Sequence, residues 1–541
     1  MKEMNWHKYC SNFVDMLLLI GGVFLSYYFC PRGAAAITIL SLIFSLLIWI
    51  VLLKQVKVLQ EIRENIGISI LALSSSTIVL EENYSWFIKS RGEQIYRVAS
   101  FFDGYADKME KLLIIGLMGC AILAGGVLLL LFWKKIIGFC KCFWKHCDVI
   151  DKRYIIICGI IVTVAIIVIY NITNIFSNTG VKYNVVYSSD TGSLCMGNVW
   201  LQVNHGENDV RQPLFALGSI PFSSLAALGG RVLFLMPNIY IILLAIMQGG
   251  LLLLVNAMLA KLLKIEGHVK VIYYLISSFG YSNIIFMLNL EQYVFSVFYL
   301  IMFFYCILNK EDEKVNGYLY ALATGSLITS AVVCVWKEKY LGWKDIIKTI
   351  FRRVVIFIGV LSMFGRLRVF LNLERFKFVL SFSSYNEEDT LSVGEKLLQY
   401  FNFIKSVFVK PQIQIVEDAY YRLAEVNSIS IIGGIILLLA ILGFCVTYKN
   451  RVSQISAFWM VFSFGVLVIG GWGARENGMI LYTLYFGWAF TLLLFQLFNK
   501  LCEKWKKAGV VLGYTLSAAV LIINCVGILE LIQFGISRYP H

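Results

Sequence analysis

The sequence predicts an all-α, polytopic membrane protein, a bundle of about 13–14 transmembrane helices, and two observations predict this. Of the 541 residues, 59% are hydrophobic and 15% are charged, with a mean hydropathy of +0.76. Soluble globular chains lie closer to half apolar, so one core could not bury this much apolar surface. The apolar residues also form runs of roughly 18 or more, the length that crosses a bilayer as a helix. An open sheet is excluded because backbone groups that face lipid must be paired internally.

Thirteen apolar runs are predicted to span the membrane, and a shorter run, 66–80, is a further candidate. The thirteen are 12–30, 34–53, 112–133, 154–175, 234–262, 271–289, 293–309, 315–335, 350–371, 428–447, 455–472, 479–498 and 508–532. Residues 54–111 otherwise form an amphipathic, mixed-charge helical segment. We therefore divide the chain into an N-terminal accessory module, 1–150, made of a hairpin, this segment and one span, and a transmembrane core, 151–541.

The net charge of +14 comes from Lys and Arg at the ends of the apolar runs. This pattern favours the positive-inside rule over a nucleic-acid partner. The strongest basic stretches, 134–153, 448–451 and 500–507, are assigned to the cytoplasm. Two long segments, 176–233 and 372–427, then lie on the outer face. The turns at Glu291 and at 473–478 fall on that face too.

One pair of basic clusters conflicts with this alternation. Residues 310–314 and 337–353 both look cytoplasmic, yet a single predicted span, 315–335, separates them. Either 315–335 is two short half-spans or a re-entrant hairpin, or the second cluster lies outside. Gly325 and Ser326 would accommodate a break in the helix.

Most of the thirteen cysteines lie in apolar runs and are expected to pack as small hydrophobic residues. Cys140, Cys142, His146 and Cys147 are residue types that bind zinc, but their spacing is not that of a zinc module. Lysines interleave them, so we interpret this stretch as a basic cytoplasmic loop. No metal site is predicted there.

The segment from Tyr183 to Phe222 mixes acids, His205, prolines and aromatic residues directly after an outward span. Its prolines suggest short interfacial helices lying along the membrane. Asp190 is the acid of interest. A carboxylate at the membrane surface can act as general base toward a bound hydroxyl, and burial would raise its pKa toward that role. The alternative is a solvated loop with incidental charges.

The same segment resembles the GT-C superfamily of integral-membrane glycosyltransferases, and more narrowly a bacterial group of GT-C-like proteins. The matching residues are Ser189, Asp190, Thr191 and Gly192, then Asn204 and His205, then Pro213, Leu214 and Phe215. Gln212 departs from the resemblance, because a histidine is expected before the proline; Arg211 is a possible substitute. Glu291 and the sequence Arg475–Glu476–Asn477 match acidic and late outer-loop features of that group, and Lys410–Pro411 matches more weakly.

The resemblance implies an inverting transfer from a polyprenyl-phosphate sugar at the outer face of the bacterial plasma membrane. The acceptor would be a glycan, lipid or protein, with membrane lipids around the site. Asp190 is then the candidate base, and Arg211, Arg475 and, more weakly, Lys410 are candidates for the phosphate. His205, Glu291 and Glu476 would orient the acceptor or the interfacial helices. No cofactor is expected; a divalent ion at Glu207 and Asp209 is conceivable but not predicted. The acidic residues Glu387, Glu388 and Asp389 are expected to be a solvated surface run.

Three other functions stay open at this point. A transporter or lipid flippase should carry charges at mid-span and internal repeats, and the sequence has few such charges and no repeat. An O-antigen polymerase or ligase typically has a large late outer loop rich in Arg and His, whereas 372–427 contains no His. A non-catalytic GT-C-like remnant would explain the departure at Gln212.

Overall fold

A computed structural model describes most of the chain. The described residues are 6–33, 35–101, 105–176, 185–187, 189–206, 208–233, 238–309, 312–337, 339, 342–381 and 391–541, without the side chains of 6–10, 378–381 and 475–477.

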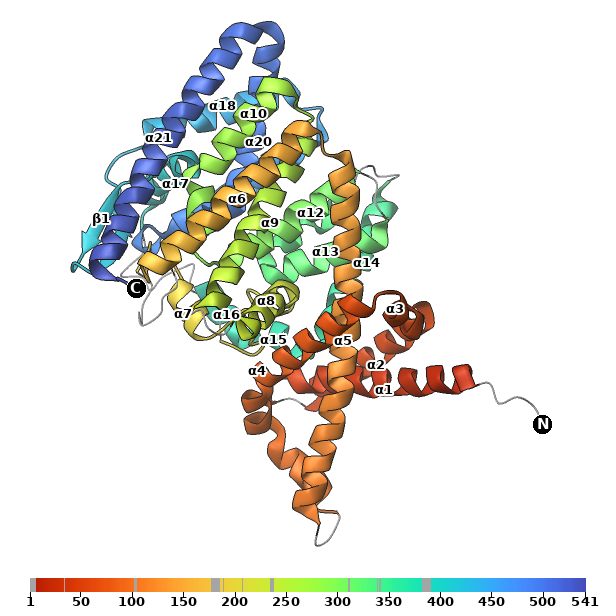
Figure 1. The fold of residues 1–541 in the computed structure, drawn as a ribbon. Coiled ribbons are helices and arrows are strands. Elements are labelled where there is room, and N and C mark those ends of the chain that lie inside the picture. Colours follow the sequence, from red (N-terminus) through yellow and green to blue (C-terminus); the bar gives the residue numbers. More distant parts are fainter. Residues whose placement is uncertain are drawn as a thin grey trace.

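Helices make up nearly all of the described structure (Figure 1). The first half of the chain contains α1 Trp6–Phe29, α2 Ala35–Gln55, α3 Val58–Glu64, α4 Ile66–Ala99, α5 Ala106–His146, α6 Val149–Ile172, α7 Thr191–Met196, α8 Phe215–Val232, α9 Ile239–Leu263 and α10 Gly267–Phe279. The second half contains α11 Tyr281–Leu288, α12 Gln292–Leu308, α13 Glu313–Ser326, η1 Ile328–Val335, α14 Trp343–Met363, α15 Leu367–Phe370, α16 Leu373–Ser381, α17 Val393–Phe408, α18 Ile431–Thr447, α19 Arg451–Phe464, η2 Gly465–Ile469, η3 Arg475–Tyr482, α20 Thr483–Lys504 and α21 Lys506–Arg538. One antiparallel hairpin, β1 Ile413–Val416 and β2 Tyr420–Leu423, pairs Ile413 with Leu423.

The predicted all-α, multi-pass architecture is confirmed. Every predicted span coincides with one helix or with two consecutive helical segments. Among the described residues, 8 helices are long and apolar enough to cross a membrane, or 9 if α10 and α11, bent by 53°, form one span. The eight are in α1, α2, α5, α6, α9, α19 with η2, α20 and α21. The helices α12 and α18 are apolar but shorter, at 17 residues each.

The stretch interpreted as a basic loop, 134–153, is mainly helical, which corrects that interpretation. The helix α5 continues through it to His146 and has 41 residues, a length of about 60 Å at the usual rise. The turn is short because Asp148 caps α6 and Asp151 completes the capping box. The same two carboxylates bind Lys270, which is 3% exposed, and Asp151 also pairs with Lys261 at 2.6 Å. This satisfied ion network fixes the junction of α5, α6 and α10.

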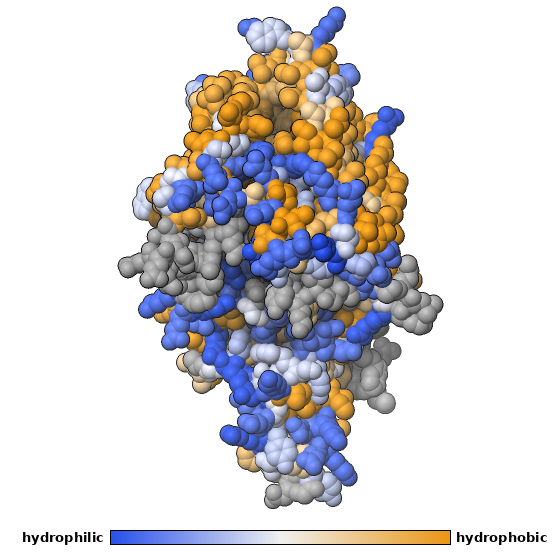
Figure 2. Space-filling model, turned by 90° about the vertical axis from the view of Figure 1, so that its left-hand side faces the viewer, coloured by the Kyte–Doolittle hydropathy of each residue, from blue (hydrophilic) through white to orange (hydrophobic). Residues whose placement is uncertain are grey.

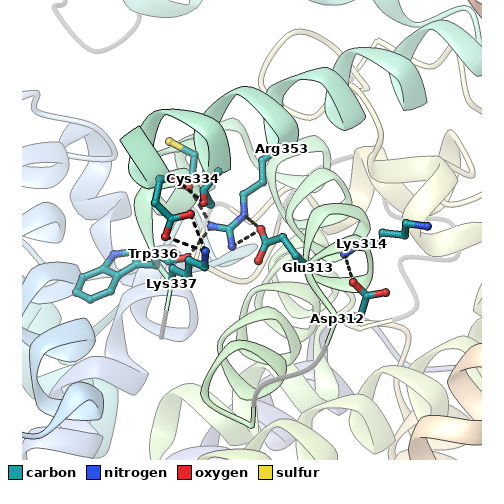
Figure 3. A network of polar contacts seen from close by, with 9 residues as sticks. Asp312, Glu313, Lys314, Cys334, Trp336, Lys337 and Arg353 are labelled. Atoms are coloured by element: carbon teal, nitrogen blue, oxygen red, sulfur yellow. Dashed lines mark hydrogen bonds and ion pairs between the residues drawn. The ribbon is translucent and has the colours of Figure 1, made fainter. Parts of the chain in front are cut away.

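The described residues of the two basic clusters lie together, because Arg353 meets Glu313. Arg353 of α14 is fully buried, and it donates from Nε to Glu313 Oε1 at 2.9 Å. It also donates from Nη1 to the carbonyls of Cys334 and Trp336, at 2.9 and 2.6 Å (Figure 3). These bonds join the start of α13 to the end of η1. Residues 313–335 therefore fold back on themselves, as the hairpin alternative requires, and we call them the 313–335 hairpin.

The tip of the 313–335 hairpin reaches the segment that carries Arg211. The helix α13 ends at Ser326 because Leu327 adopts an extended conformation. Gly325 O then accepts from Leu214 N, and Ile328 N donates to Arg211 O, both at 2.8 Å. The hairpin thus links one end of the bundle to the other.

The buried hydrophobic residues form two cores, and the boundary between them falls within α5. The larger core contains residues from Phe143 to Phe534, and the smaller contains residues from Leu18 to Trp133 together with Leu201, Val203, Ala216, Ile220 and Met363. The N-terminal helices therefore pack against α8 and the chain between α7 and α8. Asn83 of α4 donates to Leu201 O at 2.8 Å and accepts from Val203 N at 3.0 Å.

The polar segments and the basic turns lie at opposite ends of the core. The turns between α5 and α6 and between α20 and α21 lie toward the top of Figure 1, whereas α7, α8, α15 and α16 lie at the lower end of the core, near the middle of the view and above α1. Seen from the side of α21 and β1, apolar side chains cover the upper part of the molecule, and polar side chains are more frequent below (Figure 2). This distribution is typical of a bundle whose upper part faces lipid.

Candidate functional site

Asp190 lies directly before α7, and β-type pairing fixes the chain that leads to it. Tyr187 N donates to Tyr421 O at 2.8 Å, and Tyr421 N donates to Val185 O at 2.9 Å. Because Tyr421 belongs to β2, the late segment 372–427 holds the early segment 176–233 in place. Asp190 is half-buried, and its carboxylate makes no capping hydrogen bond to α7.

The structure brings Asp190 to Glu291, which is 101 residues later. Asp190 N donates to Glu291 Oε1 at 3.1 Å, and Thr191 Oγ1 donates to Leu290 O at 3.1 Å. Glu291 lies in the turn between α11 and α12 and is 1% exposed. Its Oε2 has no hydrogen-bond partner in the described part of the chain. Gln248 of α9 holds the turn by accepting from Glu291 N at 3.2 Å.

Two neighbouring carboxyl groups in a buried place favour the uptake of a proton. Burial, and then the charge of Asp190, raise the pKa of Glu291 well above its ordinary value, and the hydrogen bonds from the backbone and from Thr191 only partly oppose this. The arrangement is therefore a pair of acids in which the buried Glu291 favours its protonated form.

Aromatic rings from two late elements surround this pair. Tyr293 and Tyr482 lie edge to face, with ring centroids 5.3 Å apart. Trp472 Nε1 donates to Tyr482 Oη at 2.5 Å. The charges of Asp190 and Glu291 both act on Tyr293, and those of Asp190 and Arg211 both act on Tyr482. Asp190 thus acts on both rings, Glu291 acts on Tyr293 and Arg211 acts on Tyr482. The three charged groups therefore lie around the same pair of aromatic rings.

Arg211 is part of a charged group with Asp209 and Arg375. Asp209 is 7% exposed; its Oδ1 accepts from Arg211 Nε at 3.2 Å and its Oδ2 from Arg375 Nη2 at 3.0 Å. Arg375 comes from α16, a part of the chain for which the sequence suggested no role. Two guanidinium groups therefore meet at one carboxylate, and guanidinium groups are donors that suit a phosphate.

His205 and the residues around Pro213 have clear structural partners. The imidazole of His205 lies directly against Gly197, where a Cβ would collide with it. Arg366, buried and not identified in the sequence, donates from Nε to Pro213 O at 3.0 Å and from Nη1 to Asn204 Oδ1 at 2.5 Å. Gln212, the departure from the resemblance, is 6% exposed within this same turn.

Lys410 lies in a different environment from Asp190. Its Nζ pairs with Glu530 of α21 at 2.7 Å, and its backbone N donates to Asn524 Oδ1 at 2.9 Å. The pair is partly exposed, so its structural contribution is small. Lys410 therefore ties the end of α17 to α21.

Several predicted positions fall outside the described part of the structure. The backbone of Arg475 and Glu476 opens η3, but their side chains lie outside the described residues, as do Glu207 and the run Glu387–Asp389. Within the part that is described, no group of three or more His, Cys, Asp and Glu residues could hold a metal ion.

Sequence reasoning missed Tyr293, Tyr482, Arg366 and Arg375. Tyr293 had a usable signal, because it follows Glu291 by two residues. Arg366 and Arg375 had none, since each is one basic residue among many near helix ends.

No family model matches the chain, and no curated protein or solved structure matches it at a significant level.

Proposed function

We propose that the chain is a membrane glycosyltransferase that moves a sugar from a polyprenyl-phosphate donor to an acceptor hydroxyl at the extracytoplasmic face. The observation that carries the proposal is the meeting of Asp190, Glu291 and Arg211 at the end of the bundle opposite the basic turns. An acid pair and guanidinium groups close together are what transfer from a phosphate-linked sugar requires.

In the proposed reaction the acceptor oxygen attacks the anomeric carbon of the donor. The acceptor proton passes to the Asp190 carboxylate, and the bond from the anomeric carbon to the phosphate oxygen breaks with inversion. The electron pair leaves with the polyprenyl phosphate, whose charge Arg211 and Arg375 stabilise. Glu291 fixes the backbone of Asp190 through the bond to its N–H, so its role is positioning.

The experiment uses the purified full-length chain in detergent with labelled polyprenyl-phosphate sugars. Asp190→Asn should lower transfer by about 10²–10⁴-fold, the usual contribution of a general base. Asp418→Asn is the matched control, because Asp418 is 81% exposed in the β1–β2 turn and should leave transfer unchanged. Full activity of Asp190→Asn would show that the assigned base is wrong.

Two other outcomes would replace the proposal. Transfer from a pyrophosphate-linked oligosaccharide, but from no monosaccharide donor, would indicate a polymerase or ligase. Lipid flux across vesicles without any sugar transfer would indicate a flippase or transporter.

A further inference from the structure

A cavity separate from the acid pair lies between α17, the chain that follows β2, and η3. Its volume is about 140 Å³. Pockets that enclose a drug-sized ligand have about 300–1,000 Å³, so this cavity holds one small unit. A cavity of about 150 Å³ is known to hold a six-membered ring.

Polar side chains on one face of α17 line the cavity. Gln399, Asn402 and Ser406 follow each other at helical spacing, and Lys405 is beside them. Asn427 and Ser428 face them from the other wall, and no carboxylate is among the described lining residues. Amides and hydroxyls, with a few apolar residues, are groups that recognise the hydroxyls of a sugar.

Two of these groups lack the partners that such residues normally have. Gln399 is 8% exposed, and its side-chain oxygen is buried without a hydrogen-bond partner. Buried polar atoms are nearly always paired, so this oxygen points to a missing ligand. Lys405 forms no ion pair within the described residues, and burial lowers its pKa. The negative charge of a bound ligand would pair with Lys405. A hydroxyl of the same ligand would donate to the side-chain oxygen of Gln399.

The element η3 connects this cavity to the acid pair. It contributes Met479 and Ile480 to the cavity wall and Tyr482 to the ring that Asp190 and Arg211 act on. Two residues of a 3₁₀-helix rise about 4 Å. The cavity wall and the ring of Tyr482 therefore belong to the same element.

We infer that this cavity binds one sugar ring that carries a carboxylate, with Gln399 accepting from a hydroxyl and Lys405 pairing with the carboxylate. Its role as part of the acceptor rests on the proposed function, but the binding itself does not. The acid pair and the cavity would together hold the acceptor for transfer.

The test measures binding of free D-glucuronate to the purified chain by saturation-transfer NMR and calorimetry. We expect binding, with D-glucose at least about 10-fold weaker because it lacks the charge-assisted bond. Lys405→Met and Gln399→Leu should each weaken glucuronate by about 10-fold. Lys396→Met, on the same helix but outside the cavity, is the matched control and should bind like the unmodified chain.

Three results would overturn the inference: no glucuronate binding, equal binding by Lys405→Met and Lys396→Met, or equal displacement by inorganic phosphate, which would indicate a simple anion site. Asp190→Asn should bind glucuronate normally. Glucuronate binding by an unmodified chain that transfers no sugar would count against the proposed function alone, and transfer without glucuronate binding would count against the cavity alone.

Discussion

At the scale of single residues, Glu291 is the group whose chemistry depends most on its surroundings. It is 1% exposed, next to Asp190, and its pKa is raised well above the ordinary value of 4.5. The folded state therefore binds this proton more tightly than the unfolded chain does. The resulting stabilisation is fully present below pH 4.5 and is lost as the pH rises through the raised value.

Glu291→Gln should remove this part of the pH dependence, because the amide resembles the protonated acid. We expect the melting temperature of the unmodified chain to fall, relative to that of Glu291→Gln, as the pH rises from about 4 to 9. Thermal unfolding in detergent across this range measures the difference. Asp418→Asn, at an 81% exposed site, should keep the unmodified slope; parallel curves for Glu291→Gln would contradict the raised pKa.

At the scale of elements, the 313–335 hairpin decides where Arg211 lies. Its base is closed by Arg353, and its tip bonds to the backbone of Arg211 and Leu214 at 2.8 Å. Tyr485 of α20 adds a hydrogen bond to Ser330 at 2.8 Å. The hairpin is thus held at both ends. A change at its base should therefore displace the backbone of Arg211 at the candidate site.

Arg353→Met should destabilise the fold by about 1–3 kcal/mol, because it leaves two carbonyls and the partly buried Glu313 carboxylate without their donor. Arg352→Met is the matched control: Arg352 is the preceding residue and is only partly buried. Chemical unfolding of both variants gives the comparison. Similar stability of the two variants would mean that the ion pair with Glu313 does not hold the hairpin closed.

At the scale of the whole molecule, the N-terminal helices pack against α8 and the chain between α7 and α8. The smaller hydrophobic core includes Leu201 and Ala216, and Trp133 of α5 donates to Pro221 O at 2.9 Å. Residues 1–150 were predicted to be an accessory module without a stated role. Their packing gives them one, since they support the chain between α7 and α8.

Asn83→Leu should cost about 2–4 kcal/mol, because two buried backbone groups, Leu201 O and Val203 N, lose their partners. Glu81 is on the same helix as Asn83 and forms an exposed ion pair with Arg231 of α8. Glu81→Gln, which breaks this pair, should cost less than about 1 kcal/mol. Equilibrium unfolding measures both. Equal losses would show that the buried amide is not what joins α4 to the outer segment.

The orientation of the bundle gives a separate test in intact cells. In a chain whose thirteen cysteines are replaced by alanine or serine, Asp418→Cys should react with a membrane-impermeant thiol reagent added outside. Lys506→Cys should react only after the membrane is opened, because the basic turn at α21 is assigned to the cytoplasm. The reverse pattern would place Asp190 inside the cell and exclude the proposed function.

The sequence by itself determined the class of fold. Long apolar runs demand lipid, and each run coincides with a helix or a helix pair. It also drew attention to Asp190, which lies in a polar segment after an apolar run, and, through the resemblance, to Glu291. A break near Gly325 was one of two alternatives that the basic clusters left open.

Only the tertiary structure decided which distant residues meet. Nothing local distinguishes Arg375 or Arg366 from other basic residues, and their partners lie more than a hundred residues away. The closed base of the 313–335 hairpin depends on Arg353, which lies beyond the hairpin in the sequence. Hydropathy reports how each segment interacts with lipid or water, whereas a site depends on pairings between segments, and these are fixed by packing.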